Sequence, residues 1–435
     1  MSDQHSRLDS RLAGAARTLP VQTPVAHALT DGLSVEIVAL LRVLLINDGA
    51  SPHTGGMNRM VVDTSAGLVR AGHAVAIAYH DDRSVTVNCP VFRVPEALPM
   101  AGRREALDAA LAEFRPDVIY NHSTKILPLL PDLAERFPLA TFFHDQSIFC
   151  SGGDRCLRGW TPCQRPHGWA CLWHHYVGGC GGRNPLNNWR LWREMSLRMA
   201  PWHLPRSRVQ VASRFMQQGL RENGFPEARL DVVPLFAEPA AAVTGLATER
   251  GLLLVPSRLV RSKGVDVAVK ALAGLSDVSC RLVIAGDGPE KATLSGLAAK
   301  LGLANRVEFT GEIRPADLAN WYSRAAVVLF PVLRPEPFGL VGVEALACGK
   351  PIVAFAGGAV DEWLWPGETG LRVAAHTPAA FAACIRELLL APDRAEAMGR
   401  AAKARYPFFH PSAFIERLVA AFERTIRWHR ETTSR

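Results

Sequence analysis

Two carboxylates lie eight residues apart in the stretch 334–351, where Glu336 occupies a proline-bounded loop and Glu344 an apolar, alanine-rich segment typical of a buried helix. An unpaired carboxylate in such a helix would cost several kcal/mol, so Glu344 needs a partner. Gly339 lies where the helix begins and lets a ligand approach the backbone. Carboxylates accept hydrogen bonds from hydroxyl groups, and a helix start favours an anion. The pattern indicates a site for a phosphorylated sugar, with a general acid and base pair for hydrolysis as the alternative.

A basic loop provides a second candidate site. Arg258 and Lys263 follow the β-prone run 251–256, and a helical pattern begins near Val265. Arginine offers two parallel hydrogen bonds, and lysine offers a compact charge. We expect this loop to bind a diphosphate, although a solvent-exposed basic loop would have the same composition.

Glycines mark two further loops that a ligand could approach. Gly55 and Gly56 precede a helical pattern whose first amides could bind a phosphate or sugar, but a tight turn explains the pair equally well. Gly286 and Gly288 follow the apolar run 281–285. The third glycine and the acidic ribose partner of a dinucleotide fingerprint are missing there, so this turn is not such a fingerprint.

One histidine, His144, directly follows the buried run 139–143. Ligands of open α/β sheets bind at the carboxyl ends of the strands. The position of His144 is therefore equally consistent with a chemical role and with packing.

The elements that must position these residues alternate between short apolar runs and helical patterns, which predicts parallel sheets covered by helices. A chain of 435 residues is longer than one core usually supports, so we expect two domains. The predicted parts are a disordered extension at 1–38, a first α/β domain at 39–237 with an insertion at about 150–202, a linker at 238–250, a second α/β domain at 251–408, and a C-terminal helix at 409–435 that returns to the first domain.

Composition narrows the class of partner. The net charge of +8 favours anionic partners such as nucleotides, lipid headgroups or nucleic acid, but no nucleic-acid-binding motif accompanies it. No run of about 18 apolar residues occurs, and residues 1–38 lack the apolar core of a secretory signal, so we expect a cytoplasmic chain that does not span a membrane. Nine cysteines without such a signal favour reduced thiols over disulfides.

The insertion at 150–202 is rich in cysteine, histidine and tryptophan. Five of the nine cysteines fall within 31 residues, at Cys150, Cys156, Cys163, Cys171 and Cys180. None forms a Cys-x-x-Cys pair, so a structural zinc or iron–sulfur site and packed free thiols both stay open. Tryptophan and arginine alternate through the stretch 183–208, which suits a membrane interface or a surface for a lipid-linked acceptor, and suits equally an amphipathic helix packed on its own domain.

Together, the two carboxylates, the basic loop, the turn from Gly286 to Pro289 and the two strand–helix halves resemble the retaining GT-B glycosyltransferases of family 4, also called glycosyltransferase group 1. The resemblance covers about residues 41–430. It implies two Rossmann-like domains that face a central cleft. The acceptor would bind on the side of the N-terminal domain, 39–237, and the nucleotide sugar mainly on the C-terminal domain, 251–408. The Cys- and Trp-rich insertion departs from the common core of that family.

The resemblance also implies roles for individual residues. Glu336 would contact the hydroxyls of the donor sugar, and Glu344 would hold the ribose. Arg258 and Lys263 would neutralise the diphosphate, and His144 would reach the transferred sugar. Glu336, His144, Arg258 and Lys263 would thus be the catalytic residues. The other implied donor-binding residues are Glu344, Gly55, Gly56, Gly286, Gly288, Phe338, Gly339 and Leu340.

The implied reaction moves a hexose from a UDP- or GDP-sugar to a glycan or polyprenyl-linked acceptor, with retention of the anomeric configuration and without a required metal or cofactor. The leaving phosphate would help to take the acceptor's proton on the same face of the sugar. We therefore expect an enzyme of polysaccharide or glycoconjugate synthesis that contacts the inner face of the membrane through 183–208. The alternatives are a nucleotide-sugar epimerase of the same architecture and a non-catalytic nucleotide-sugar-binding protein.

Overall fold

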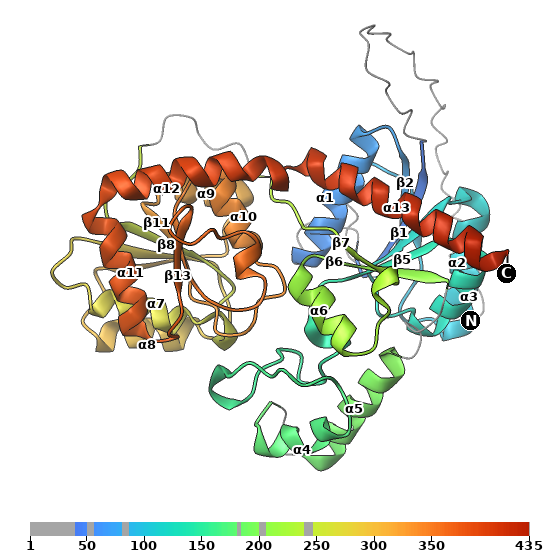
Figure 1. Ribbon diagram of the computed structural model, residues 1–435, viewed down its shortest axis with the longest axis horizontal. Coiled ribbons are helices and arrows are strands. Elements are labelled where there is room, and N and C mark those ends of the chain that lie inside the picture. The colour runs from blue at the N-terminus through green and yellow to red at the C-terminus, as the bar shows by residue number, and fades with distance from the viewer. Residues whose placement is uncertain are drawn as a thin grey trace, which may run out of the picture. The chain divides into compact units, whose positions relative to one another are not determined.

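The computed structural model describes residues 40–49, 56–80, 87–180, 184–199, 206–238 and 247–434. In these ranges the chain forms two parallel β-sheets, of seven and six strands, with helices packed on them (Figure 1). The apolar runs form the strands because helices cover both faces of a parallel sheet, so successive residues are buried without alternation. The predicted α/β fold is confirmed. The predicted extension at 1–38 and most of the predicted linker lie outside the described residues.

The first sheet has the strand order β3-β2-β1-β4-β5-β6-β7, and all neighbouring strands are parallel. Its strands are β1 (Arg42–Asn47), β2 (Ala74–Tyr79), β3 (Val91–Arg93), β4 (Val118–Asn121), β5 (Leu139–Phe143), β6 (Ser207–Val211) and β7 (Leu230–Val232). The helices that connect them include α1 (Gly56–Arg70), α2 (Met100–Phe114), α3 (Leu130–Arg136) and α6 (Arg214–Glu222). The strand order reverses between β1 and β4, so the loops that follow these two strands diverge and leave room for a ligand.

The second sheet repeats this plan in the order β10-β9-β8-β11-β12-β13, again with parallel neighbours. Its strands are β8 (Leu252–Pro256), β9 (Arg281–Ala285), β10 (Val307–Gly311), β11 (Val327–Phe330), β12 (Ile352–Phe355) and β13 (Gly370–Val373). Its helices are α7 (Val265–Ala273), α8 (Lys291–Lys300), α9 (Pro315–Arg324), α10 (Leu340–Ala347), α11 (Pro378–Leu390) and α12 (Pro392–Arg405). Here the order reverses between β8 and β11.

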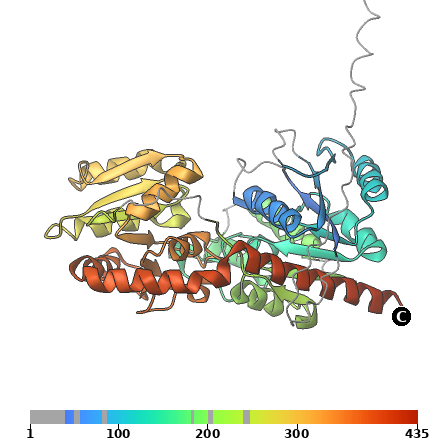
Figure 2. The same ribbon diagram turned by 90° about the horizontal axis from the view of Figure 1, so that it is seen from above.

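A long C-terminal helix, α13 (Pro411–Thr433), follows α12 and packs against α1 and β5 of the first sheet (Figures 1 and 2, red). Its buried face repeats every fourth residue at Phe414, Leu418 and Phe422. The Phe414 ring lies 4.6 Å from that of Phe236, measured between centroids. The predicted return of the C-terminal helix to the first half is therefore confirmed.

The insertion of the first half contains two short helices that lie against each other, α4 (Ala170–Val177) and α5 (Pro185–Met199) (Figure 1, green). His175 of α4 contacts Asn188 of α5, and the ring of Trp169, the N-cap residue of α4, contacts that of Trp192 on α5. In the described part of the chain, no helix combines the length and apolar composition that a membrane crossing requires.

Candidate functional site

The loops that follow β8 and β11 meet where the strand order of the second sheet reverses, and they bring Lys263 and Glu336 together. Lys263 Nζ donates a hydrogen bond to Glu336 Oε2 at 3.0 Å. Only 16% of the Lys263 side chain and 11% of the Glu336 side chain are exposed. Gly264 permits this approach, because a Cβ at that position would lie 2.0 Å from the carbonyl oxygen of Pro331. Two residues that the sequence placed in separate loops thus form one ion pair at the switch point of the sheet.

A second cation, Arg334, lies on the other side of this carboxylate. Arg334 Nε is 3.7 Å from Glu336 Oε2, and Arg334 Nη1 donates to Asp154 Oδ1 at 2.6 Å. Burial acts to lower the pKa of Arg334, but the carboxylates of Glu336, Asp154 and Asp145 raise that pKa above its ordinary value. Glu336 Oε2 therefore lies between a lysine and an arginine. Sequence reasoning gave Arg334 no role, because its partners are far away in the chain.

The start of α10 is fixed by a tryptophan that sequence reasoning missed. Trp363 is fully buried, and its Nε1 donates to the carbonyl oxygen of Phe338 at 2.5 Å. A Cβ at Gly342 would lie 2.2 Å from the Trp363 ring, so only glycine lets the first turn of α10 rest on it. Gly339 caps the helix with a positive φ of 94°, and Leu340 is its first residue. Phe338 is 3% exposed and belongs to the core under the helix start.

The second carboxylate, Glu344, has the partner that its buried surroundings require. Tyr322 of α9 donates its hydroxyl to Glu344 Oε2 at 2.6 Å. Burial raises the pKa of Glu344 above its ordinary value, while the Tyr322 hydrogen bond and the charge of Arg59 act in the opposite direction. Glu344 lines a small cavity together with Arg59 of α1 and Glu238. Glu344 can therefore exchange hydrogen bonds with a ligand in that cavity.

Of the remaining predicted donor residues, Arg258, Gly286 and Gly288 lie in loops that follow β8 and β9, and Gly56 lies in the first half. Arg258 is exposed, and its side chain makes no ion pair with any described residue. Gly286 and Gly288 pack against the backbone of the Arg258 loop, since a Cβ at either would lie within 2.5 Å of a carbonyl oxygen there. Protein packing thus accounts for both glycines. Gly55 lies outside the described residues, and Gly56 is the first residue of α1.

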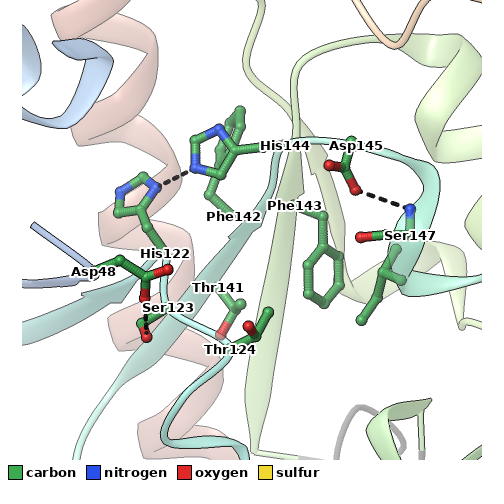
Figure 3. A pocket seen from close by; sticks show the side chains of 11 residues that line it. Asp48, His122, Ser123, Thr124, Thr141, Phe142, Phe143, His144, Asp145 and Ser147 are labelled. Carbon is green, nitrogen blue, oxygen red and sulfur yellow. Dashed lines mark hydrogen bonds between the residues drawn. The ribbon is translucent and has the colours of Figure 1, made fainter. Parts of the chain in front are cut away.

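The histidine predicted from the first half lies beside a second histidine. His144 Nε2 and His122 Nδ1 are 2.9 Å apart, and Figure 3 shows the two rings facing each other. Burial lowers the pKa of His144 to about 4 and that of His122 well below its ordinary value, so both imidazoles are neutral at neutral pH. His122 directly follows β4 as His144 follows β5. The same argument from strand ends could therefore have found His122.

These histidines line a cavity of about 180 Å³ at the carboxyl ends of β1, β4 and β5. Two carboxylates also line it (Figure 3). Asp48 Oδ1 accepts a hydrogen bond from Ser123 Oγ at 2.7 Å, and Asp145 Oδ1 accepts one from the backbone of Ser147 at 2.9 Å. The cavity thus offers carboxylates, a hydroxyl and neutral imidazoles, which suit the hydroxyl groups of a sugar.

Two buried residues of the first half hold the loop that carries Glu336. Gln146 Nε2 donates to the carbonyl oxygen of Pro335 at 2.6 Å, and Ser213 Oγ donates to that of Pro337 at 2.6 Å. Both side chains are 0% exposed. Gln146 lies two residues after His144, so this hydrogen bond also links the histidine segment to the Glu336 loop. Sequence reasoning missed both contacts.

We expect Gln146→Met to lower kcat/KM for the donor about tenfold, because it leaves the buried Pro335 carbonyl without its donor and loosens the Glu336 loop. Steady-state kinetics at varied donor concentration measures this effect. The matched control is Gln218→Met, since Gln218 is exposed on α6 and bonds only to Glu222 of the same helix in the described structure. Equal kinetics of the two variants would show that the Gln146 contact does not support the site.

The cysteines of the insertion gather around one cavity. All five line it, and so do His167, His174 and His175. The nine cysteines of the chain are free thiols. Burial raises the pKa of Cys156 to about 12 and that of Cys180 to about 11, as expected for packed thiols in apolar surroundings.

Two of the three imidazoles at this cavity are held by other side chains. His175 contacts Ser151 and Asn188, and His167 Nε2 lies 3.1 Å from Ser196 Oγ. Among the described residues, no group of three or more His, Cys, Asp or Glu side chains is arranged to hold a metal ion. The zinc or iron–sulfur site stays a prediction, which metal analysis of anaerobically purified protein can test.

The two parallel sheets and the helix that returns to the first of them define the chain as a GT-B glycosyltransferase fold. A sucrose-phosphate synthase of Thermosynechococcus elongatus is similar in structure, with a TM-score of 0.69, 22% identity, and coverage of 88% of this chain and 98% of that one. HepE of Anabaena in complex with UDP and glucose is also similar, with a TM-score of 0.65, 19% identity, and coverage of 88% and 99%. Because both structures are no more than 22% identical to this chain, their similarity shows a shared fold alone.

Sequence comparison gives the family. The family model described as glycosyl transferases group 1 matches residues 238–405, and the model described as glycosyltransferase family 4 matches residues 54–240. The chain belongs to the family 4, group 1 glycosyltransferases.

Curated relatives match a smaller part of the chain. A D-inositol 3-phosphate glycosyltransferase 1 of Catenulispora acidiphila is 35% identical over 200 residues, which are 43% of this chain and 48% of that protein. A D-inositol 3-phosphate glycosyltransferase of Acidothermus cellulolyticus is 36% identical over 190 residues, which are 41% of this chain and 42% of that protein. The matched region thus spans less than half the length of these two relatives.

Proposed function

We propose that this glycosyltransferase moves a hexose from a UDP- or GDP-sugar to a glycan or polyprenyl-linked acceptor, with retention of the anomeric configuration, in polysaccharide or glycoconjugate synthesis in the cytoplasm. The observation that carries the proposal is the Lys263–Glu336 ion pair at the switch point of the second sheet. It joins a cation suited to a diphosphate to a carboxylate suited to sugar hydroxyls. A UDP- or GDP-sugar contains both groups next to each other.

The bound donor would replace the hydrogen bond between Lys263 and Glu336 with its own contacts to these two residues. Its diphosphate would accept a hydrogen bond from Lys263. Arg258, which forms no ion pair with a described residue, would add a second cation beside the leaving group. Glu336, still beside Arg334, would then accept hydrogen bonds from the donor sugar. Charge develops on the leaving diphosphate, so fixed cations on that side stabilise the transition state. The leaving phosphate would take the acceptor's proton, with no covalent intermediate on the protein.

The cavity of the first half would receive the reacting sugar and the acceptor. His144 has a neutral imidazole, which can donate to or accept from a sugar hydroxyl without adding charge. Asp48 and Asp145 offer further acceptors for hydroxyl groups. HepE was solved with UDP-glucose, which supports a nucleotide-sugar donor here. The names of the curated relatives add an inositol phosphate to the acceptors worth testing.

A two-stage experiment tests the proposal. A thermal-shift screen against UDP- and GDP-sugars should find one donor that stabilises the chain, as mass action requires of a ligand of the folded state. That donor is then incubated with glycan, polyprenyl-linked and inositol-phosphate acceptors, and the anomeric configuration of the product is read by NMR. An inverted product would refute retention. Conversion of the donor without an acceptor would indicate the epimerase, and binding without turnover the non-catalytic alternative.

The ribose role proposed for Glu344 predicts a pH dependence. Only the ionised carboxylate accepts two ribose hydrogen bonds, so affinity for UDP or GDP should fall as pH drops through the raised pKa of Glu344, above its ordinary value of 4.5. Tyr322→Phe removes a hydrogen bond that favours the ionised form, so the midpoint should move to higher pH. Titration calorimetry across pH 4 to 8 measures the midpoint. The matched control is Tyr176→Phe on α4, and a Tyr322→Phe midpoint equal to the wild-type one would contradict the role.

The raised pKa of Glu344 also makes the stability of the folded chain depend on pH. The folded chain holds the Glu344 proton more tightly than the unfolded chain does. This contribution to stability is therefore fully present below the unfolded pKa and is lost as pH rises through the folded pKa.

A further inference from the structure

The two helices of the insertion expose an unusual set of large apolar side chains, here called the α4–α5 face: Trp169, Trp173, Tyr176, Val177, Leu186 and Trp189. Leu186 is 78% exposed, Trp169 73% and Trp173 67%. Large apolar side chains are rarely clustered on the surface of a soluble protein, and an exposed patch of this kind marks an interaction site. The stretch predicted to contact a membrane was 183–208, of which 183 and 200–205 lie outside the described residues. Most of the exposed aromatic side chains that the structure describes lie before this stretch, on α4 and at its N-cap.

The outward direction of these side chains is fixed by the opposite side of the two helices. His175 of α4 and Asn188 of α5 are each 1% exposed, and His175 Nδ1 lies 3.1 Å from Asn188 Oδ1. His175 Nε2 is also 2.8 Å from Ser151 Oγ. Helical spacing then places Trp169, Trp173 and Tyr176 away from this buried side. The apolar residues cannot turn inward without breaking buried hydrogen bonds.

One ring contact joins the start of α4 to α5, and a second exposed ring contacts an arginine of its own helix. The Trp169 and Trp192 rings are 4.3 Å apart, measured between centroids, and Trp192 Nε1 donates to the carbonyl oxygen of Gly168 at 3.0 Å. The guanidinium of Arg193 lies 5.5 Å from the centre of the Trp189 ring. The rings of Trp169 and Trp189 thus have protein contacts before any partner binds, which reduces the entropy that these two side chains lose on binding.

The charges around the α4–α5 face identify the kind of partner. From residue 158 to residue 199 the sequence contains a single acidic residue, Glu194. Among the residues of this stretch whose side chains the structure describes, the exposed arginines are Arg158, Arg165, Arg190 and Arg193. A surface that is both aromatic and basic is complementary to an anionic lipid surface, where tryptophan and tyrosine lie at headgroup level and arginine binds phosphate.

We propose that the α4–α5 face docks the protein onto the surface of a membrane that contains anionic lipids. Trp169, Trp173, Leu186 and Trp189 would enter the headgroup region, and Arg190 and Arg193 would bind lipid phosphates. The docking surface belongs to the insertion and uses none of the residues proposed for the donor. The inference therefore holds or fails separately from the proposed reaction.

The test is binding of the full chain to phosphatidylcholine vesicles prepared with and without phosphatidylglycerol, measured by flotation. We expect binding only with phosphatidylglycerol, and weaker binding as salt is raised. The variant Trp173→Ser/Leu186→Ser should bind at least about tenfold more weakly, because two exposed apolar side chains leave the interface. Its matched control is Leu390→Ser/Leu301→Ser, since both leucines are exposed on the second half.

A second pair of variants tests the charge. Arg190→Ser/Arg193→Ser should weaken binding about tenfold or more at low salt, whereas Arg400→Ser on α12 should not. Equal binding to both kinds of vesicle, or no difference between face variants and controls, would overturn the proposal. So would a dimer in light scattering that Trp173→Ser/Leu186→Ser dissolves, because the face would then join two copies. Binding of UDP- or GDP-sugars in titration calorimetry should be the same for all these variants, which separates a docking defect from a failure of the proposed reaction.

Discussion

Glu336→Gln is expected to lower kcat on the order of 100-fold or more, because the substitution removes a preorganised charge at the position proposed for the donor sugar. The amide is nearly isosteric and still accepts a hydrogen bond, so the loss isolates the charge. Lys263 and Arg334 would face a neutral group after the substitution, and their mutual repulsion would be uncompensated. We therefore expect a lower melting temperature as well, and kinetics must be measured well below it.

The matched control for this experiment is Glu396→Gln. Glu396 forms an exposed i, i+4 pair with Arg400 on α12, so its substitution tests the same chemical change away from the site. Surface pairs of this kind contribute little to stability. Single-turnover measurements at saturating donor should separate a slower chemical step from weaker binding. Near wild-type turnover of Glu336→Gln would remove Glu336 from the reaction.

Lys263→Ala should mainly weaken donor binding, by about tenfold to a hundredfold, because a charge-assisted hydrogen bond to the diphosphate is lost. The surroundings of Lys263 provide a second cause of weaker donor binding. Without Lys263, Arg334 at 3.7 Å is the one cation left beside the Glu336 carboxylate among the described residues, and the carboxylate repels the incoming diphosphate. Titration calorimetry with UDP and GDP measures the affinity directly, and unchanged affinity would count against the role.

The double variant Lys263→Ala/Glu336→Gln separates these two causes. If Glu336 repels the diphosphate in Lys263→Ala, removing the carboxylate should restore part of the affinity, so the two effects should be less than additive. Lys270→Ala is the matched control, since Lys270 lies on the adjacent helix α7 and pairs with Asp266 at the surface. A loss of affinity in Lys270→Ala equal to that in Lys263→Ala would indicate a general effect of charge rather than a specific contact.

Local sequence patterns were enough to predict most of the elements. Apolar runs without alternation predicted the buried parallel strands, and the prolines around Glu336 kept it out of the helix that contains Glu344. The patterns also placed α6 at Arg214–Glu222 and α11 at Pro378–Leu390. β3 was missed, because its three residues are too few to show a period. These features depend on neighbours within about one turn or one strand, which the sequence contains directly.

The partners of the site residues were decided by tertiary structure. Glu336 is held by Lys263, 73 positions away, and its loop by Gln146, 189 positions from Pro335. Tyr322 was unassigned until the packing of α9 placed its hydroxyl on Glu344. No local pattern encodes which loops the strand order brings together, because hydrogen bonds and ion pairs between loops form only after the sheets have assembled.

The sequence by itself indicated several of the residues that could do chemistry, although not Arg334 or His122, and the end of the strand or helix that each would occupy. Tertiary structure decided which of them meet, since the order of both sheets reverses at one point. Between β8 and β11 that reversal joins Lys263 to Glu336, and beside the reversal between β1 and β4 it places His122 next to His144. The order of strands is set by the burial of whole helices and strands, a property of the entire chain rather than of any segment.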